Sequence, residues 1–148
     1  MPGPSIRTVL VNVTDVERSA QFYSDVLATS ELTREDQMIS IGHPEPGGPV
    51  LFLREAPRGS SHPGSQAVGV RALSWDVGSF KELDRVEARL RAHDAFRARV
   101  EMDDATGQFI HGHDPDRLAL VFVAYQPGVE LSADHFRQLT GLMYSLDV

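Results

Sequence analysis

The chain has 148 residues, 41% of them hydrophobic and 24% charged, which is typical of one compact domain and excludes a disordered or fibrous protein. It has no cysteine, which excludes disulfides, thiolate metal sites and cysteine nucleophiles. The 21 acidic and 14 basic side chains give a net charge of -7, which argues against a nucleic-acid partner because no basic stripe is available for phosphates. The sequence has neither a membrane-spanning apolar run nor a signal peptide, so we expect a cytoplasmic protein without a membrane partner.

In the first half of the chain, periodicity and turn residues predict a strand, a helix and three further strands. The helix begins at a capping box, Thr14-Asp15-Val16-Glu17, and its apolar residues recur at helical spacing as far as residue 28. Residues 43–49 are rich in Pro and Gly and predict a loop, and the Pro, Gly and Ser residues of 56–66 predict a linker. The predicted strands cover residues 7–13, 30–34, 38–41 and 50–53.

The second half repeats this order of elements. A second capping box, Ser79-Phe80-Lys81-Glu82, begins a helix, and Asp114-Pro115-Asp116-Arg117 predicts a hairpin turn. After the last strand, Ser132 caps a final helix whose apolar stripe contains Phe136, Leu139, Leu142 and Met143. The predicted strands cover residues 67–77, 97–102, 108–113 and 118–125.

The two halves match each other with an offset of about 64 residues, which indicates an internal repeat. Each half alone would leave one face of its sheet bare, so the two sheets are expected to share a core or form a cup. We therefore predict an α+β fold in which two βαβββ modules form a cupped eight-stranded mixed sheet, followed by a C-terminal helix. The predicted organisation is a single domain over 1–148, with modules at 6–55 and 67–125, a linker at 56–66 and a helical tail at 126–148.

Two motifs carry a resemblance to a known family. Residues 13–27 read Val-Thr-Asp-Val-Glu-Arg-Ser-Ala-Gln-Phe-Tyr-Ser-Asp-Val-Leu, and Asp114-Pro115-Asp116 precedes the last strand. Together with the duplication, these motifs resemble the vicinal oxygen chelate superfamily, which includes glyoxalases, bleomycin-resistance proteins, fosfomycin-resistance enzymes and extradiol dioxygenases. The resemblance covers about residues 6–125 and implies a small-molecule site in the cup, where many members hold a divalent metal.

The positions that the resemblance assigns to metal ligands hold Thr8, Ala72 and Val121, and the fourth strand reads Val-Leu-Phe-Leu over 50–53. A divalent metal needs at least three nitrogen or oxygen donors, which this set does not supply. We therefore predict no metal at that position and no cofactor. Two further departures are Arg117 in place of the turn glycine and Ala28 in place of the glycine after the first helix.

The pair His111 and His113 is the main chemical feature that remains. Alternate residues of a strand share a face, so both imidazoles are expected to point the same way, and the resemblance implies that this face is the cavity side of the sheet. Histidine titrates near neutrality, so His111 is the candidate general acid or base; the alternatives are a hydrogen-bonding wall for His111 and a solvated strand end for His113. The predicted ligand-binding residues are Asn12, Ser74, Asp76, Phe109 and His113.

Three functions follow from this set. The first is a metal-independent isomerase, cyclase or lyase of specialised metabolism that uses His111, and the second is a protein that sequesters a drug or metabolite. The alternative is a metal-dependent extradiol dioxygenase or glyoxalase-type lyase with displaced ligands, for which His111 and His113 are candidates. The expected partners are a small organic ligand, with cationic and polycyclic compounds as candidates, and a second copy of the chain in a homodimer.

Overall fold

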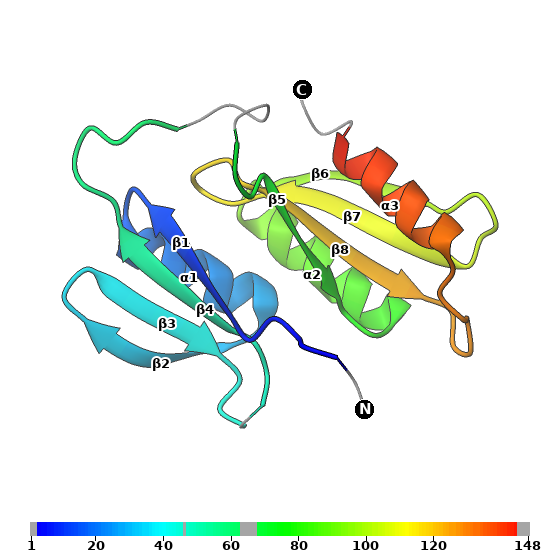
Figure 1. Ribbon diagram of the computed structural model, residues 1–148, viewed down its shortest axis with the longest axis horizontal. Coiled ribbons are helices and arrows are strands. Elements are labelled where there is room, and N and C mark those ends of the chain that lie inside the picture. Colours follow the sequence, from blue (N-terminus) through cyan, green and yellow to red (C-terminus); the bar gives the residue numbers. More distant parts are fainter. Residues whose placement is uncertain (1–2, 46, 63–67, 145–148) are drawn as a thin grey trace. The chain divides into compact units, whose positions relative to one another are not determined.

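The computed structural model describes residues 3–45, 47–62 and 68–144, with side chains up to residue 141. The order of elements is βαβββ in each half, followed by a third helix (Figure 1), which confirms the predicted α+β fold of two βαβββ modules with a C-terminal helix. The chain divides into two compact units, Met1–His62 and Pro63–Val148, and each is described by itself. Residues 63–67, at the end of the predicted linker and the start of the next predicted strand, and the side chains of Leu142 and Met143 lie outside the described part.

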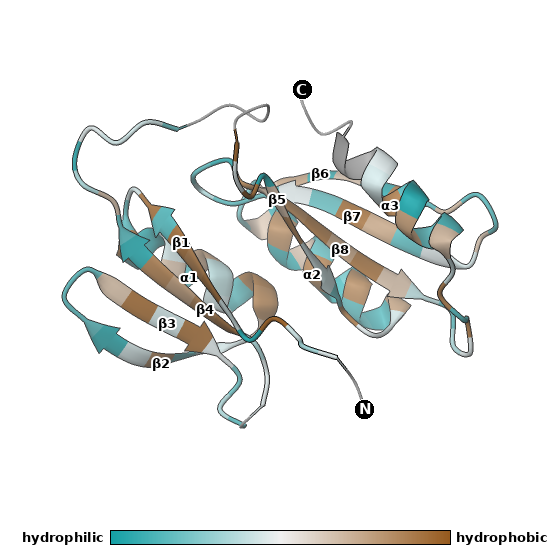
Figure 2. Cartoon of the chain, viewed as in Figure 1, coloured by the Kyte–Doolittle hydropathy of each residue, from teal (hydrophilic) through white to brown (hydrophobic). Residues whose placement is uncertain are grey.

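The first unit is a four-stranded mixed sheet with one helix. Strand β1 is parallel to β4, which is antiparallel to β3, and β3 is antiparallel to β2 at the edge. All residues of β2 are exposed, and Figure 2 shows this strand as largely hydrophilic. The elements are β1 (Thr8–Val13), α1 (Val16–Leu27), β2 (Ser30–Glu35), β3 (Met38–Gly42) and β4 (Val50–Glu55).

Helix α1 begins one residue later than the sequence predicts. Asp15, not Thr14, is the N-cap: its backbone is extended and its carboxylate accepts a hydrogen bond from the backbone N–H of Arg18 at 3.0 Å. The Thr14 hydroxyl instead accepts a hydrogen bond from the guanidinium of Arg18, 3.0 Å away. Either residue type can cap a helix, so the sequence does not decide between neighbours. The helix buries one stripe, formed by Val16, Ser19, Ala20, Phe22, Tyr23 and Val26.

The second unit has a sheet of the same type, with the order β5-β8-β7-β6. The eight strands are thus divided between two four-stranded mixed sheets. Strand β5 is shorter than the predicted 67–77 and begins only at Ala72. The elements are β5 (Ala72–Asp76), α2 (Phe80–Ala92), β6 (Phe96–Glu101), β7 (Gly107–His113), β8 (Ala119–Tyr125) and α3 (Ala133–Tyr144).

Helix α2 covers one face of the second sheet. The hydroxyl of Ser79 caps it as predicted and accepts a hydrogen bond from the backbone N–H of Glu82 at 3.1 Å. Strand β8 is buried along most of its length, and Figure 2 shows it as largely hydrophobic. Within the described residues, no helix is long and apolar enough to cross a membrane. The core on this face is formed by Leu83, Val86 and Leu90 of α2 and by Ile110, Leu120, Phe122 and Ala124 of the sheet.

Candidate functional site

Strand β7 presents its two histidines on the face of the second sheet opposite α2. A Cβ atom added to Gly112 would lie 2.7 Å from the carbonyl oxygen of Ala95 and 3.2 Å from the methyl carbons of Leu90. Gly112 therefore faces α2, and only glycine fits there without a clash. Because side chains alternate along a strand, His111 and His113 lie on the other side, which we call the His111 face.

One end of the His111 face is covered by helix α3. There Met102, Phe109, Val121 and Val123 are buried together, with 0–3% of their surfaces exposed, and Leu139 of α3 packs against them with Tyr125. The predicted ligand-binding residue Phe109 belongs to this cluster and is 3% exposed. At this end the face is therefore an apolar core.

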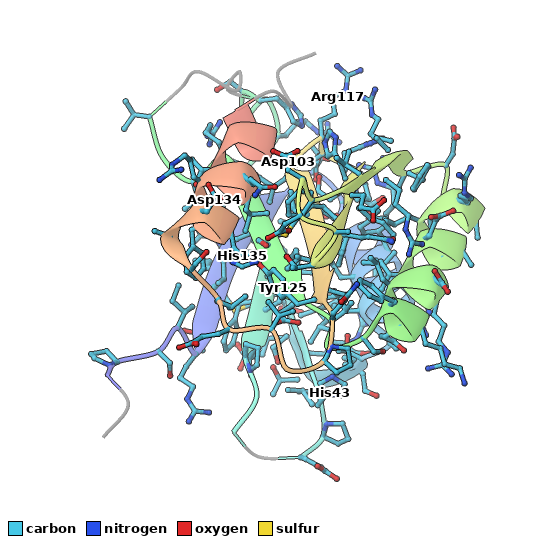
Figure 3. The ribbon with its side chains drawn as sticks, turned by 90° about the vertical axis from the view of Figure 1, so that its right-hand side faces the viewer. His43, Asp103, Arg117, Tyr125, Asp134 and His135 are labelled. Carbon is cyan, nitrogen blue, oxygen red and sulfur yellow. The ribbon has the colours of Figure 1, made fainter. Side chains whose placement is uncertain are left out.

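A buried histidine holds α3 in place. His135 is 6% exposed, and its Nδ1 accepts a hydrogen bond from the backbone N–H of Ser132 at 2.9 Å. Its Nε2 lies 2.9 Å from the hydroxyl of Thr106, and its ring meets that of Tyr125 edge-on, with 5.8 Å between centroids. Figure 3 shows this pair where α3 meets the end of β8. His135 is not among the predicted site residues, because only the spacing Ser132-x-x-His135 signals this contact.

The other end of the face, around His111 and His113, adjoins this apolar cluster at Val121. His111 is half-buried and is paired across the strands with Val121 on one side and Ala98 on the other. His113 is paired with Ala119, and Ser74 is in register with Val121. Ala98 beside His111 and Ala119 beside His113 are thus the small side chains next to the imidazoles. We call the residues Ser74, Arg97, Ala98, His111, His113 and Ala119 the open end of the His111 face.

Arg97 joins this group although the sequence analysis missed it. The register of β6 against β7 shifts between Phe96 and Ala98, so Arg97 is the extra residue of a bulge. Its Nε donates a hydrogen bond to Nδ1 of His113 at 3.3 Å, which places its guanidinium on the His111 face. Strand alternation alone cannot reveal this placement, because a bulge changes the side to which one residue points.

The environment of the two imidazoles favours their neutral forms. Burial, together with the positive charge of Arg97 and the neighbouring His113, lowers the pKa of His111 from 6.5 to about 4. Burial and then Arg97 also lower the pKa of His113, although the carboxylates of Asp114 and Asp94 oppose this. At neutral pH His111 is therefore an uncharged donor and acceptor. Such a low pKa makes it a weak proton acceptor, because general-base catalysis is most efficient with a pKa near the working pH.

The other predicted ligand-binding residues lie elsewhere. Asp76 is at the end of β5, where its carboxylate accepts a hydrogen bond from the backbone N–H of Gly78 at 2.9 Å. Asp76 is in register with Val123, whereas Ser74 is in register with Val121, the neighbour of His111. Burial is the main cause that raises the pKa of Tyr125, and the negative charge of Asp76 adds to it. Asn12 belongs to the first unit, where its side-chain oxygen accepts a hydrogen bond from Nε of Arg54 at 3.0 Å.

The metal positions implied by the family do not fit a metal in this chain. Val121 is 0% exposed inside the apolar cluster, and Ala72 is paired with Ala119, so neither offers a donor. Thr8, in the first unit, is paired with Val50. In the part of the chain that the structure describes, no three His, Asp or Glu side chains are grouped so that they could hold a metal ion. The donors needed to offset the dehydration of a divalent ion are not brought together there.

The two positions at which glycine is replaced have left-handed backbones. Arg117, labelled in Figure 3, ends the Asp-Pro-Asp turn with a φ of 69°, and Ala28 ends α1 with a φ of 52°. The turn itself is held by Asp114, which is 1% exposed and accepts hydrogen bonds from the backbone N–H groups of Asp116 and Leu118, both at 2.8 Å. The turn motif therefore has a structural role and sets the register of β7 against β8.

Comparisons with solved structures agree with this topology. A glyoxylase/bleomycin resistance protein/dioxygenase domain from Frankia sp. EAN1pec is 28% identical, with 87% of this chain and 96% of that chain covered and a TM-score of 0.69. A glyoxalase/dioxygenase from Nostoc punctiforme is 19% identical, with 82% and 91% covered and a TM-score of 0.67. A lactoylglutathione lyase from Agrobacterium tumefaciens is 17% identical, with 84% and 96% covered and a TM-score of 0.62. The last two similarities show the fold alone.

Sequence comparison identifies the family more directly. Among curated proteins no sequence matches significantly. The family model of the Glyoxalase/Bleomycin resistance protein/Dioxygenase superfamily, however, matches residues 5–122, which include both βαβββ modules almost completely. The chain therefore belongs to the glyoxalase/bleomycin resistance protein/dioxygenase superfamily.

Proposed function

We propose that this protein binds a small organic molecule at the open end of the His111 face and acts by sequestering it. The observation that carries the proposal is the group of polar side chains, His111, His113 and Arg97, next to the small residues Ala98 and Ala119. Polar groups that converge beside small apolar residues are the usual composition of a ligand site. Membership of a superfamily whose proteins bind small molecules supports the same proposal.

The neutral state of His111 favours sequestration over acid–base catalysis. Sequestration needs a hydrogen-bonding wall, which a neutral imidazole supplies, whereas a general acid needs a proton that His111 does not hold at neutral pH. A metal-independent isomerase, cyclase or lyase remains the second candidate, because an uncharged half-buried imidazole can accept a proton. The change His111→Gln separates the two: it abolishes turnover in an enzyme and alters only affinity in a sequestering protein.

Steric blocking tests the location of the site. Ala98 is exposed on β6 beside His111, so Ala98→Trp covers the open end, whereas Ala88→Trp adds the same ring to an exposed position of α2 on the other side of the sheet. A mixed library of small organic acids, amides and amines is screened by NMR for compounds that shift the ring signals of His111 and His113. We expect Ala98→Trp to weaken the best of these compounds by at least about tenfold and Ala88→Trp to leave it within about twofold. Unchanged binding to the Ala98→Trp variant would refute the location.

A homodimer is also part of the proposal. Leu139 packs against the sheet of its own unit, whereas Phe136 on the same helix is 52% exposed. An exposed aromatic residue on an amphipathic helix favours association with a second copy. Light scattering is expected to give twice the monomer mass of 16.3 kDa, and a monomer mass would contradict this part of the proposal.

A further inference from the structure

Arg97 and Arg99 lie on the same strand, but only the positive charge of Arg99 is balanced by carboxylates among the described residues. Arg99 points toward α2 and pairs with two carboxylates, those of Asp84 at 2.7 Å and Glu87 at 3.2 Å. Arg97 points the other way and donates its Nε to an uncharged imidazole, and within the described residues it forms no ion pair with a carboxylate. The bulge of β6 therefore places an unbalanced positive charge on the His111 face.

The hydrogen bond from Arg97 also fixes how His113 is protonated. Because Nδ1 of His113 accepts the bond, the proton of the neutral ring is on Nε2, which is a donor. His111 contributes one further N–H in its neutral form, and the guanidinium keeps its Nη donors. The open end thus combines several N–H donors with one full positive charge. A site of this kind matches a carboxylate.

Two carboxylates, those of Asp94 and Asp114, oppose this charge at His113, whereas among the described residues only Arg97 and His113 act electrostatically on His111. The carboxylate of Asp114 is engaged by two backbone N–H groups of its own turn, at 2.8 Å each. Asp94 lies in the connection after α2 and, like Asp114, raises the pKa of His113. The positive charges of Arg97 and Arg117 lower the same pKa. The lowered pKa values of both histidines follow from burial and from this local positive charge, which an anion would offset.

We propose that the ligand of the open end is an organic anion, whose carboxylate oxygens are bound by Arg97, His111 and His113. Its apolar body would lie against Ala98 and Ala119. The net charge of -7 suggests a cationic ligand instead, but charges farther than a Debye length of about 8 Å are screened at physiological salt, so the local groups decide. This inference rests on the proposed binding function and names the class of ligand for that site.

Three probes with the same phenyl ring test the charge of the ligand: benzoate, its neutral isostere benzamide, and the cation benzylamine. Each is titrated at millimolar concentration near neutral pH while the ring signals of His111 and His113 are followed by NMR. We expect benzoate to bind at least about tenfold more tightly than benzamide and benzylamine. Because an anion offsets the positive surroundings, benzoate should also raise the pKa of His111, whereas benzamide should leave it unchanged.

Matched arginine variants identify the group that recognises the anion. Arg97→Gln is expected to remove the preference for benzoate over benzamide, and Arg97→Lys, which keeps the charge but loses the planar fork, to retain part of it. Arg85→Gln removes the same charge from α2, where Arg85 pairs with Glu82, and should leave benzoate affinity within about twofold. Amide spectra of each variant verify that the fold is intact.

The outcomes separate this inference from the function on which it rests. If benzamide or benzylamine shifts the same histidines as strongly as benzoate, or if Arg97→Gln keeps the preference, the ligand class is wrong and the binding face stands. If none of the three probes, and no compound of the wider library, shifts His111 or His113, both the ligand class and the proposed function are refuted.

Discussion

The low pKa of His111 makes a specific prediction about how stability depends on pH. In the folded protein, burial and the charge of Arg97 hold this pKa at about 4, whereas an unfolded chain should show the ordinary value of 6.5. Between these two values the unfolded chain binds more protons than the folded protein. Stability is therefore lost as the pH falls from 6.5 toward 4, and above pH 6.5 His111 contributes no pH dependence.

The size of the effect follows from the shift and from the exposure of the ring. At about 1.4 kcal/mol per pKa unit, the full shift corresponds to about 3 kcal/mol. His111 is only half-buried, and solvent screening reduces the effect of its surroundings, so we expect a loss of about 1–2 kcal/mol between neutral pH and about pH 4. The variant His111→Gln has no group that titrates at this position. Between neutral pH and about pH 4 its free energy of unfolding should therefore fall by about 1–2 kcal/mol less than that of the original protein.

Urea unfolding of both proteins near neutral pH and near pH 4.5 measures the difference, and NMR titration of the His111 ring gives its pKa directly. His43→Gln, which removes an exposed histidine in the loop after β3, serves as the control and should follow the original protein. A pKa of His111 near 6.5, or the same loss of stability for His111→Gln as for the original protein, would show that the ring lacks the buried and positively charged surroundings argued above.

Three substitutions and one elemental analysis test the fold and the site further. Ala28→Gly should stabilise the protein by about 0.5–1 kcal/mol in urea unfolding, because Ala28 has a left-handed backbone with φ 52°. Gly112→Ala should destabilise it by about 2 kcal/mol or more, because the new Cβ would lie 2.7 Å from a carbonyl oxygen; a neutral effect would mean that β7 is in another register. Leu139→Ala should cost about 1–2 kcal/mol and lower the hydrogen-exchange protection of α3, which rests on this contact. Elemental analysis of the dialysed protein should find no stoichiometric transition metal, because Val121 offers no donor; one metal per chain would contradict this.

The fold could be predicted from the sequence because local and long-range signals agree. The helical stripes of α1 and α2, their caps and the duplication all predict the same βαβββ unit, and the structure has that unit twice. The predicted cap of the first helix was wrong by one position, because Thr14 and Asp15 are both residue types that cap helices. Ala28 and Arg117, which stand where the family has glycine, do not change the order of helices and strands, because a non-glycine residue in the left-handed region costs only about 1 kcal/mol.

The candidate site was less accessible to sequence reasoning. Strand alternation placed His111 and His113 on one face, and Gly112 between them shows why that face is opposite α2. Arg97 was not predicted because a β-bulge turns its side chain toward His113. A bulge of this kind is visible in the strand pairing of the structure and not in the composition of the strand. Phe109 lies on the same face of β7 as the two histidines, as the alternation of the strand predicts. The sequence does not reveal, however, that α3 covers this part of the face.

The apolar cluster under α3 and the lost metal donors have one physical explanation. A carboxylate at the position of Val121 would be buried among Phe109, Met102 and Val123, where an unpaired charge costs several kcal/mol. Leu139 packs on this cluster, so a charged side chain at position 121 would also disturb the contact that holds α3. The apolar residue at position 121 therefore suits a packed helix better than a metal ligand. The polar groups of this face, Arg97, His111 and His113, lie where the apolar cluster ends.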